Sequence, residues 1–179
     1  MGIEIERRFF IDGRGQKPWR GERALSIFQC YLTGVTLDKG TIVWNGHNLA
    51  FEETELANIS TWRIRLQDGE AILTAKGSRT GATAMEFEWP LSQELFKSLS
   101  LEDLPSITKT RYLWDGEDGL LWEVDEFESP LAGLIIAEVE LESENQPVVI
   151  PPWTGLELTN LRGWSNAALA RMLKDAMHP

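Results

Sequence analysis

The chain has 179 residues, 42% of them hydrophobic and 25% charged, which fits one domain with its own core. Seventeen basic against 28 acidic residues give a formal net charge of −11. This charge argues against a nucleic-acid or anionic-membrane binder, because either would need a basic face.

Cysteine and histidine are too scarce for most metal and redox chemistry. Cys30 is the single cysteine, and His47 and His178 are the only histidines. These counts exclude a disulfide framework, a zinc–thiolate cluster and a histidine-rich metal site. Any metal would therefore have oxygen ligands, which favours a hard cation such as Mg²⁺ or Mn²⁺.

The N-terminal segment turns acidic at Glu4, which is unlike a secretory signal. The best apolar run, 131–137, is too short to span a bilayer. We therefore expect a cytoplasmic protein, monomeric or homodimeric, with no nucleic-acid or membrane partner.

Short segments of alternating hydrophobicity, separated by turn signals, predict an antiparallel β protein, either a sandwich or a barrel. The predicted strands are 3–11, 25–32, 61–66, 71–76, 84–89, 109–114, 120–127 and 134–141, with a weaker one at 156–159. Ser92 is expected to cap a short helix and Ser165 a longer one.

The segment 33–60 separates the second and third strands by an unusually long gap. Its Asn45-Gly46 pair is the favoured sequence for a two-residue turn and predicts an extra hairpin over 41–51. We interpret the segment as an insertion: a tolerated surface element, a lid or an interaction hairpin. The expected organisation is one domain over 1–179 with an insertion at about 33–60.

Charged side chains alternate with apolar ones inside the predicted strands, and each pair carries one sign. The acidic pairs are Glu4/Glu6, Glu86/Glu88, Glu123/Asp125 and Glu138/Glu140; the basic pairs are Arg63/Arg65 and Lys109/Arg111. Residues at i and i+2 share one face of a strand. A half-solvated sheet with its charges outside explains any one strand. A closed sheet with these faces inward explains the set, because opposite signs across the interior relieve the repulsion.

The order of these motifs resembles the CYTH superfamily, also called triphosphate tunnel metalloenzymes. The matching segments are Glu4-Ile5-Glu6-Arg7-Arg8 (E-x-E-x-K), Gln29 to Leu32, Trp62 to Arg65, Thr74 to Gly77, Glu86 to Glu88, Lys109 to Arg111, Trp122 to Phe127, Leu131 to Leu134, Ala137 to Glu140, Glu157 to Thr159 and Trp164 to Asn166. The match covers nearly the whole chain. It departs from the family at Arg8, where the signature has lysine, and at Leu158, Gly163 and Trp164 in the closing motif.

The resemblance implies a mostly β fold, a closed eight-stranded antiparallel β-barrel with a few flanking helices, whose charged interior binds a linear triphosphate with Mg²⁺ or Mn²⁺. It implies metal ligands at Glu4, Glu6, Glu140, Asp125 and Glu138. It implies phosphate contacts from Arg8, Arg63, Arg65, Lys76, Lys109, Arg111 and Arg162. It implies catalytic roles for Glu86, Glu88, Asp125, Glu138 and Arg8.

The activity that follows is hydrolysis of inorganic tripolyphosphate to pyrophosphate and phosphate. Such catalysis consists mainly of positioning and charge stabilisation. The same resemblance leaves open an adenylyl cyclase, a thiamine triphosphatase and a non-catalytic polyphosphate-binding barrel. Arg8 favours the last of these, because arginine cannot give up a proton near neutral pH.

Overall fold

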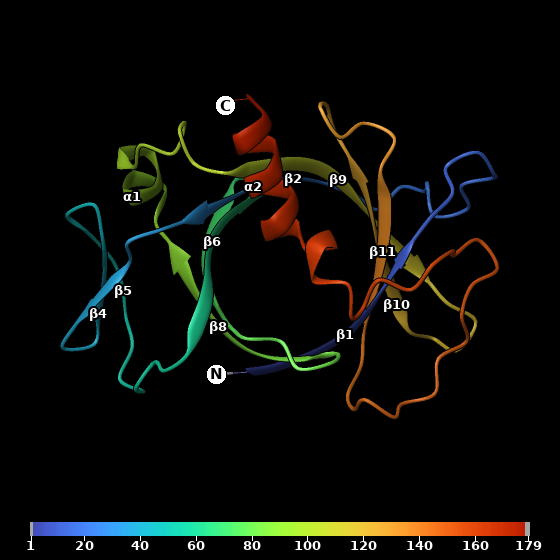
Figure 1. The fold of residues 1–179 in the computed structure, drawn as a ribbon, viewed down its shortest axis with the longest axis horizontal. Helices are drawn as coiled ribbons and strands as arrows, with labels where there is room; N and C mark the ends of the chain where they lie inside the picture. The colour runs from blue at the N-terminus through green and yellow to red at the C-terminus, as the bar shows by residue number, and fades with distance from the viewer. Residues whose placement is uncertain (1, 178–179) are drawn as a thin grey trace.

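The computed structural model describes residues 2–177, so His178 lies outside the described residues. Eight strands close into an antiparallel barrel in the order β1-β11-β10-β9-β2-β6-β7-β8 (Figure 1). They are β1 (Gly2–Phe10), β2 (Ala24–Leu32), β6 (Ile59–Gln67), β7 (Glu70–Gly77), β8 (Thr83–Leu91), β9 (Ser106–Asp115), β10 (Leu121–Phe127) and β11 (Ile135–Glu140). The predicted barrel is confirmed, and the sandwich alternative is wrong.

Seven of the eight barrel strands point charged side chains into the barrel and pack an apolar face outside it, whereas β2 points neutral side chains such as Leu25 and Tyr31 inward. In β1, for example, Glu6 and Arg8 line an interior cavity, whereas Phe9 packs with Trp122 and Val139 in a cluster outside the wall. Trp19, from the loop after β1, is 1% exposed and completes that cluster. The outward apolar face therefore supplies the hydrophobic core, and the ionic residues are left to the lumen.

A second, three-stranded sheet is formed by β3 (Thr36–Asp38), β4 (Thr41–Trp44) and β5 (His47–Phe51). The predicted hairpin is confirmed: Asn45 and Gly46 have φ of 47° and 78°, as a type I′ turn requires. Ile42 and Trp44 pack against Ile64 and Leu73 of the barrel wall. Figure 1 shows β4 and β5 beside β6 and β8, outside the barrel. This position favours the surface element over the lid.

Both predicted helix caps are confirmed. The Ser92 hydroxyl accepts a hydrogen bond of 3.1 Å from the Leu95 N–H at the start of α1 (Gln93–Ser98). The Ser165 hydroxyl accepts one of 3.1 Å from the Ala168 N–H at the start of α2 (Asn166–Met177). Neither described helix has the length and apolar character that a membrane crossing requires.

Helix α2 follows the short 3₁₀ helix η1 (Arg162–Trp164) and lies against β2 and β9 (Figure 1). Its Leu169 and Ala170 pack with Tyr31, Ile107 and Phe127. These barrel residues lie near the C-terminal ends of β2 and β10 and the N-terminal end of β9. The helix therefore covers part of one end of the barrel, which we call the α2 end.

The strand predicted at 156–159 is wrong, because the segment forms only an isolated bridge between Glu157 and Phe9. The Arg8 N–H donates to the Thr159 hydroxyl at 3.0 Å instead of to a backbone carbonyl. The ladder with β1 therefore stops after one bridge.

Candidate active site

The inner wall of the barrel is divided by charge into two halves. Four adjacent strands, β8, β1, β11 and β10, carry the acidic pairs. In the other half, β9, β6 and β7 carry the basic residues, and β2 lies between β9 and β6. In the basic half, β2 contributes the neutral pair Gln29 and Tyr31, which are hydrogen-bonded to each other at 2.7 Å. Arg8 is the exception, a base within the acidic half. The homotypic pairs of the sequence thus become two facing walls of opposite sign.

Three cavities with shared lining residues follow the barrel interior. The central one, about 290 Å³, is lined by Glu4, Glu6, Leu25, Arg63, Arg65, Gln67, Lys76, Arg111, Glu86, Glu123, Glu138, Glu140 and Asn166. The cavity at the α2 end, about 280 Å³, shares Glu6, Arg63, Lys76 and Asn166 with it. The third, about 230 Å³, is lined by Gly2, Ile3, Glu4, Glu86, Glu88 and Glu140. The space therefore runs from a basic end to an acidic end.

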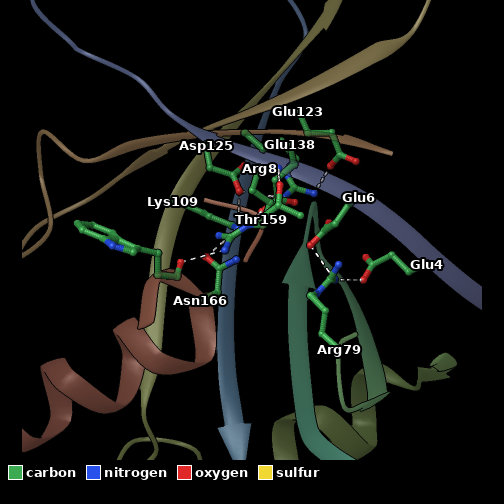
Figure 2. Close-up of polar contacts among 12 residues, drawn as sticks. Glu4, Glu6, Arg8, Arg79, Lys109, Glu123, Asp125, Glu138, Thr159 and Asn166 are labelled. Atoms are coloured by element: carbon green, nitrogen blue, oxygen red, sulfur yellow. Dashed lines mark hydrogen bonds and ion pairs between the residues drawn. The ribbon is translucent and has the colours of Figure 1, made fainter. Parts of the chain in front are cut away.

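Asp125 is the fixed centre of the ion-pair network (Figure 2). Arg111 donates to its two oxygens from Nε and Nη2, at 2.7 and 2.8 Å, and Lys109 Nζ donates at 2.6 Å. Burial alone would raise the pKa of Asp125, but Arg111 and Lys109 outweigh burial and lower it. Burial lowers the pKa of Lys109 to about 8, against the opposing effect of Asp125. With both oxygens occupied, Asp125 positions the two bases and has no free oxygen for a metal in this arrangement.

Glu138 joins that network to Arg8. Arg8 Nε donates to Glu138 at 3.2 Å, and Arg8 Nη1 donates to the Trp164 carbonyl at 3.0 Å. Arg111 Nη2 lies 3.5 Å from the same Glu138 carboxylate. Arg8 Nη2 is buried without a hydrogen-bond partner. The arginine at the family's lysine position is therefore a fixed cation with one free donor.

Arg63 and Arg65 are the least satisfied bases of the wall. The Nε atoms of both are buried without a hydrogen-bond partner. Arg63 donates from Nη2 to Thr74 at 3.1 Å, whereas Arg65 has no ion pair or side-chain hydrogen bond among the described residues. Burial, with Arg63 and Arg111 nearby, lowers the pKa of Arg65 to about 10. Buried guanidinium donors that face a cavity form a site for an anion.

Two bases cross from the basic half to the acidic carboxylates. Lys76 Nζ lies 2.7 Å from Glu4 and 3.0 Å from Glu86, the latter out of line for a hydrogen bond. Arg79, from the loop after β7, donates from Nη2 to Glu4 and to Glu6, at 2.9 Å each (Figure 2). Burial, together with Glu138 and Glu4, raises the pKa of Glu6 to about 8, while Lys76 and Arg79 oppose this rise and favour the ionised carboxylate.

The carboxylates of the acidic half are the oxygen ligands that a hard divalent cation prefers. Burial, with Glu4 and Glu86 nearby, raises the pKa of Glu140, as expected where negative charges gather. No three carboxylates of residues 2–177 converge closely enough to hold a metal ion in the present arrangement. Lys76 and Arg79 pair instead with Glu4, Glu6 and Glu86.

The remaining site residues predicted from the sequence lie at the rims. The Glu88 side chain is 47% exposed at the acidic end, and Arg162 is exposed beside the cavity at the α2 end, where it donates to the Arg79 carbonyl at 3.2 Å. Arg79 and Asn166 are lining residues that the sequence analysis missed. Arg79 follows the Thr74 to Gly77 motif by two residues, but a loop has no periodicity that could reveal it.

Comparison with known proteins identifies the family to which this fold belongs. The CYTH domain matches residues 49–168 of the chain. An inorganic triphosphatase of Acetivibrio thermocellus is 31% identical over 96% of this chain and 95% of its own length. One of Nitrosomonas europaea is 36% identical over 93% of this chain and 96% of its own. A solved inorganic triphosphatase structure superposes with a TM-score of 0.58 at 31% identity and covers 95% of both chains.

Proposed function

This chain belongs to the CYTH domain family, and on that premise we propose that it is a divalent-metal-dependent hydrolase that cleaves inorganic tripolyphosphate to pyrophosphate and phosphate. Both relatives named above are inorganic triphosphatases and are covered over nearly their full length. The cleavage adds water across one P–O–P bond. The terminal phosphorus gains the water oxygen, and pyrophosphate leaves with the bridging oxygen.

The observation that carries the proposal is the set of unpartnered guanidinium donors inside the barrel, two on the basic half of the wall and one, Arg8, within the acidic half. Arg8, Arg63 and Arg65 each have a buried N–H group without a partner. An unsatisfied buried donor costs about 1–3 kcal/mol, so these groups favour a ligand rich in acceptor oxygens. A linear triphosphate supplies such oxygens along its length.

We assign the phosphate contacts to Arg8, Arg63, Arg65, Lys76, Lys109 and Arg111, with Arg162 at the rim. Cleavage moves negative charge onto the bridging oxygen, and fixed cations in a cavity stabilise that charge without reorganisation. Asp125 and Glu138 hold Lys109, Arg111 and Arg8 in place through the bonds described above. Glu86 and Glu88 would orient the attacking water.

We assign the divalent cation to Glu4, Glu6 and Glu140. When bound, it supplies Lewis-acid polarisation of the phosphate oxygens and acidifies water. Mg²⁺ and Mn²⁺ both suit a carboxylate-only ligand set. The cytoplasmic location, the monomeric or homodimeric state and the single domain over 1–179 stay predictions from the sequence.

The test is phosphate release from tripolyphosphate with Mg²⁺, with Mn²⁺ and with EDTA. We expect release with at least one metal and none with EDTA. The double variant Glu4→Gln/Glu6→Gln should lose the activity, whereas Arg23→Gln should keep it, since Arg23 pairs with Asp115 on the surface. No release with either metal would reject the hydrolase. Cyclic nucleotide and pyrophosphate from ATP would identify the cyclase instead.

A further inference from the structure

Arg79 stands where the proposed metal would bind. Its Nη2 atom lies 2.9 Å from Glu4 Oε2 and 2.9 Å from Glu6 Oε1, so one nitrogen bridges both carboxylates (Figure 2). Both carboxylates are mostly buried, with side chains 16% and 12% exposed. Two like charges on neighbouring side chains of one strand face repel each other unless a cation lies between them. Arg79 supplies that cation in the ligand-free protein.

The loop that carries Arg79 has hydrogen bonds that do not depend on its guanidinium. Thr80 and Thr83 exchange two backbone hydrogen bonds, at 2.8 and 3.0 Å, in the turn that follows Arg79. The Arg79 carbonyl accepts from Arg162. Among the described residues, the guanidinium forms hydrogen bonds only with Glu4 and Glu6, at 2.9 Å each, and with the Ala82 carbonyl, at 2.5 Å. It can therefore leave the carboxylates while the loop stays in place.

A second destination for the guanidinium lies in the same cavity. Arg79 lines the cavity at the α2 end together with Arg8, Arg63, Lys76 and Arg162. Glu6 is the one acid among the residues that line it. Once a divalent cation neutralises Glu6, this space contains bases and no unpaired acid. A phosphate chain that enters it then becomes the nearest anion to Arg79.

We propose that Arg79 is a mobile counter-cation: it neutralises Glu4 and Glu6 in the free protein, leaves them when a divalent cation binds, and then contacts the phosphate chain of the substrate. The second half of this inference rests on the proposed function; the first half concerns cation binding alone. It makes Arg79 a substrate-binding residue whose contact depends on the metal.

The first experiment measures Mn²⁺ binding by electron paramagnetic resonance and calorimetry, without phosphate. Arg79→Gln removes the competing cation, so Mn²⁺ should bind about tenfold more tightly, a change of ~1.4 kcal/mol. Arg79→Lys keeps the charge and should bind Mn²⁺ within about threefold of the wild type. Arg23→Gln, the surface control, should match the wild type. Unchanged or weaker Mn²⁺ binding by Arg79→Gln overturns the inference.

The second experiment separates substrate contact from cation competition. With saturating Mn²⁺, Arg79→Gln should raise KM for tripolyphosphate about tenfold. Arg79→Lys keeps the positive charge and should have a KM close to that of the wild type. In EDTA, tripolyphosphate affinity should differ little between wild type and Arg79→Gln, because Arg79 is then held by carboxylates. An unchanged KM with Mn²⁺ overturns the substrate contact. If the wild type does not hydrolyse tripolyphosphate, the proposed function is rejected instead. The Mn²⁺ affinities of the wild type and Arg79→Gln then still test whether Arg79 acts as a counter-cation.

Discussion

Arg65 and Arg111 lie on the same half of the barrel wall, separated by β2, and differ in what surrounds them. Arg111 is paired with Asp125 through two hydrogen bonds, with Glu138 at 3.5 Å, and with Glu123. Arg65 has a buried Nε without a partner. Arg111 therefore stabilises the fold in addition to its proposed phosphate contact, whereas Arg65 has no partner of its own among the described residues and is available to a ligand. Substitutions should separate these two roles.

We expect Arg65→Met to raise KM for tripolyphosphate about tenfold or more, since it removes a charge-assisted phosphate contact. The same change should raise the free energy of unfolding of the ligand-free protein by about 1 kcal/mol, because it removes an unsatisfied buried donor. Steady-state kinetics and urea unfolding measure the two effects. A fall in stability would show that Arg65 is a structural cation.

We expect Arg111→Met to lower the free energy of unfolding by about 3–5 kcal/mol, because Asp125 loses its main partner while remaining buried. Urea unfolding in EDTA measures this loss without any contribution from ligands. Arg23→Gln is the matched control, since it breaks an exposed ion pair of about 0–1 kcal/mol. Equal losses in the two variants would contradict the role assigned to the Asp125 network.

Cys30 should be chemically inert in the folded protein. It is 0% exposed in β2, and burial raises the pKa of its thiol to about 12. The thiol therefore stays protonated through neutral and mildly alkaline pH, and thiolate is the reactive form. We expect no reaction with a thiol reagent at pH 8 until denaturant is added. Rapid modification of the folded protein would contradict this environment.

At the scale of elements, the small sheet β3-β4-β5 belongs to the outer packing and not to the cavity. Ile42 is 0% exposed and packs in the cluster that contains Ile64 and Leu73. None of the residues that line the three interior cavities belongs to this sheet. Its contribution should therefore be to stability.

We expect Ile42→Ala to lower the free energy of unfolding by about 2–5 kcal/mol, the usual cost of a buried isoleucine truncation. KM for tripolyphosphate should stay unchanged below the unfolding transition. Calorimetry or urea unfolding measures the first effect and steady-state kinetics the second. A large rise in KM with little loss of stability would restore the lid interpretation of 33–60.

The elements were predictable wherever a local rule was strong enough to determine them. Period-two alternation located all eight barrel strands, and the Asn45-Gly46 and Asp68-Gly69 turns adopt the positive φ that their hairpins need. The three-residue β3 was missed because it is too short to show a period. The false strand at 156–159 has the alternation of a strand, but the Thr159 hydroxyl ends its pairing with Arg8.

At the scale of the molecule, the two facing walls should bind metal and triphosphate together better than either alone. The acidic half repels a polyanion that binds alone, and the basic half repels a cation that binds alone. Each bound ligand therefore reduces the repulsion that opposes binding of the other. We expect the rise in melting temperature with Mn²⁺ and tripolyphosphate to exceed the sum of the separate rises. Differential scanning fluorimetry on a variant too slow to consume the ligand measures it. Simple additivity would contradict coupling through the cavity.

The inward direction of the charges was one of two interpretations that the one-sign pairs allowed, and the resemblance to the CYTH superfamily favoured it over a solvated outer face. The individual partners did not follow from the sequence. That Asp125 would give both oxygens to Arg111 and Lys109 depends on the register of β9 against β10, where Arg111 lies opposite Asp125. The contact of Arg79 with Glu4 and Glu6 depends on the conformation of a loop, and an alternating sequence pattern does not predict loop conformation.

Gly2 lines the acidic cavity with Glu4, Glu86 and Glu140. Any peptide fused ahead of it would emerge at that opening of the lumen. A polyhistidine purification tag placed there would bring metal-chelating imidazoles beside the carboxylates and distort every titration with divalent ions. Recombinant material for such work should carry its tag elsewhere or have it cleaved.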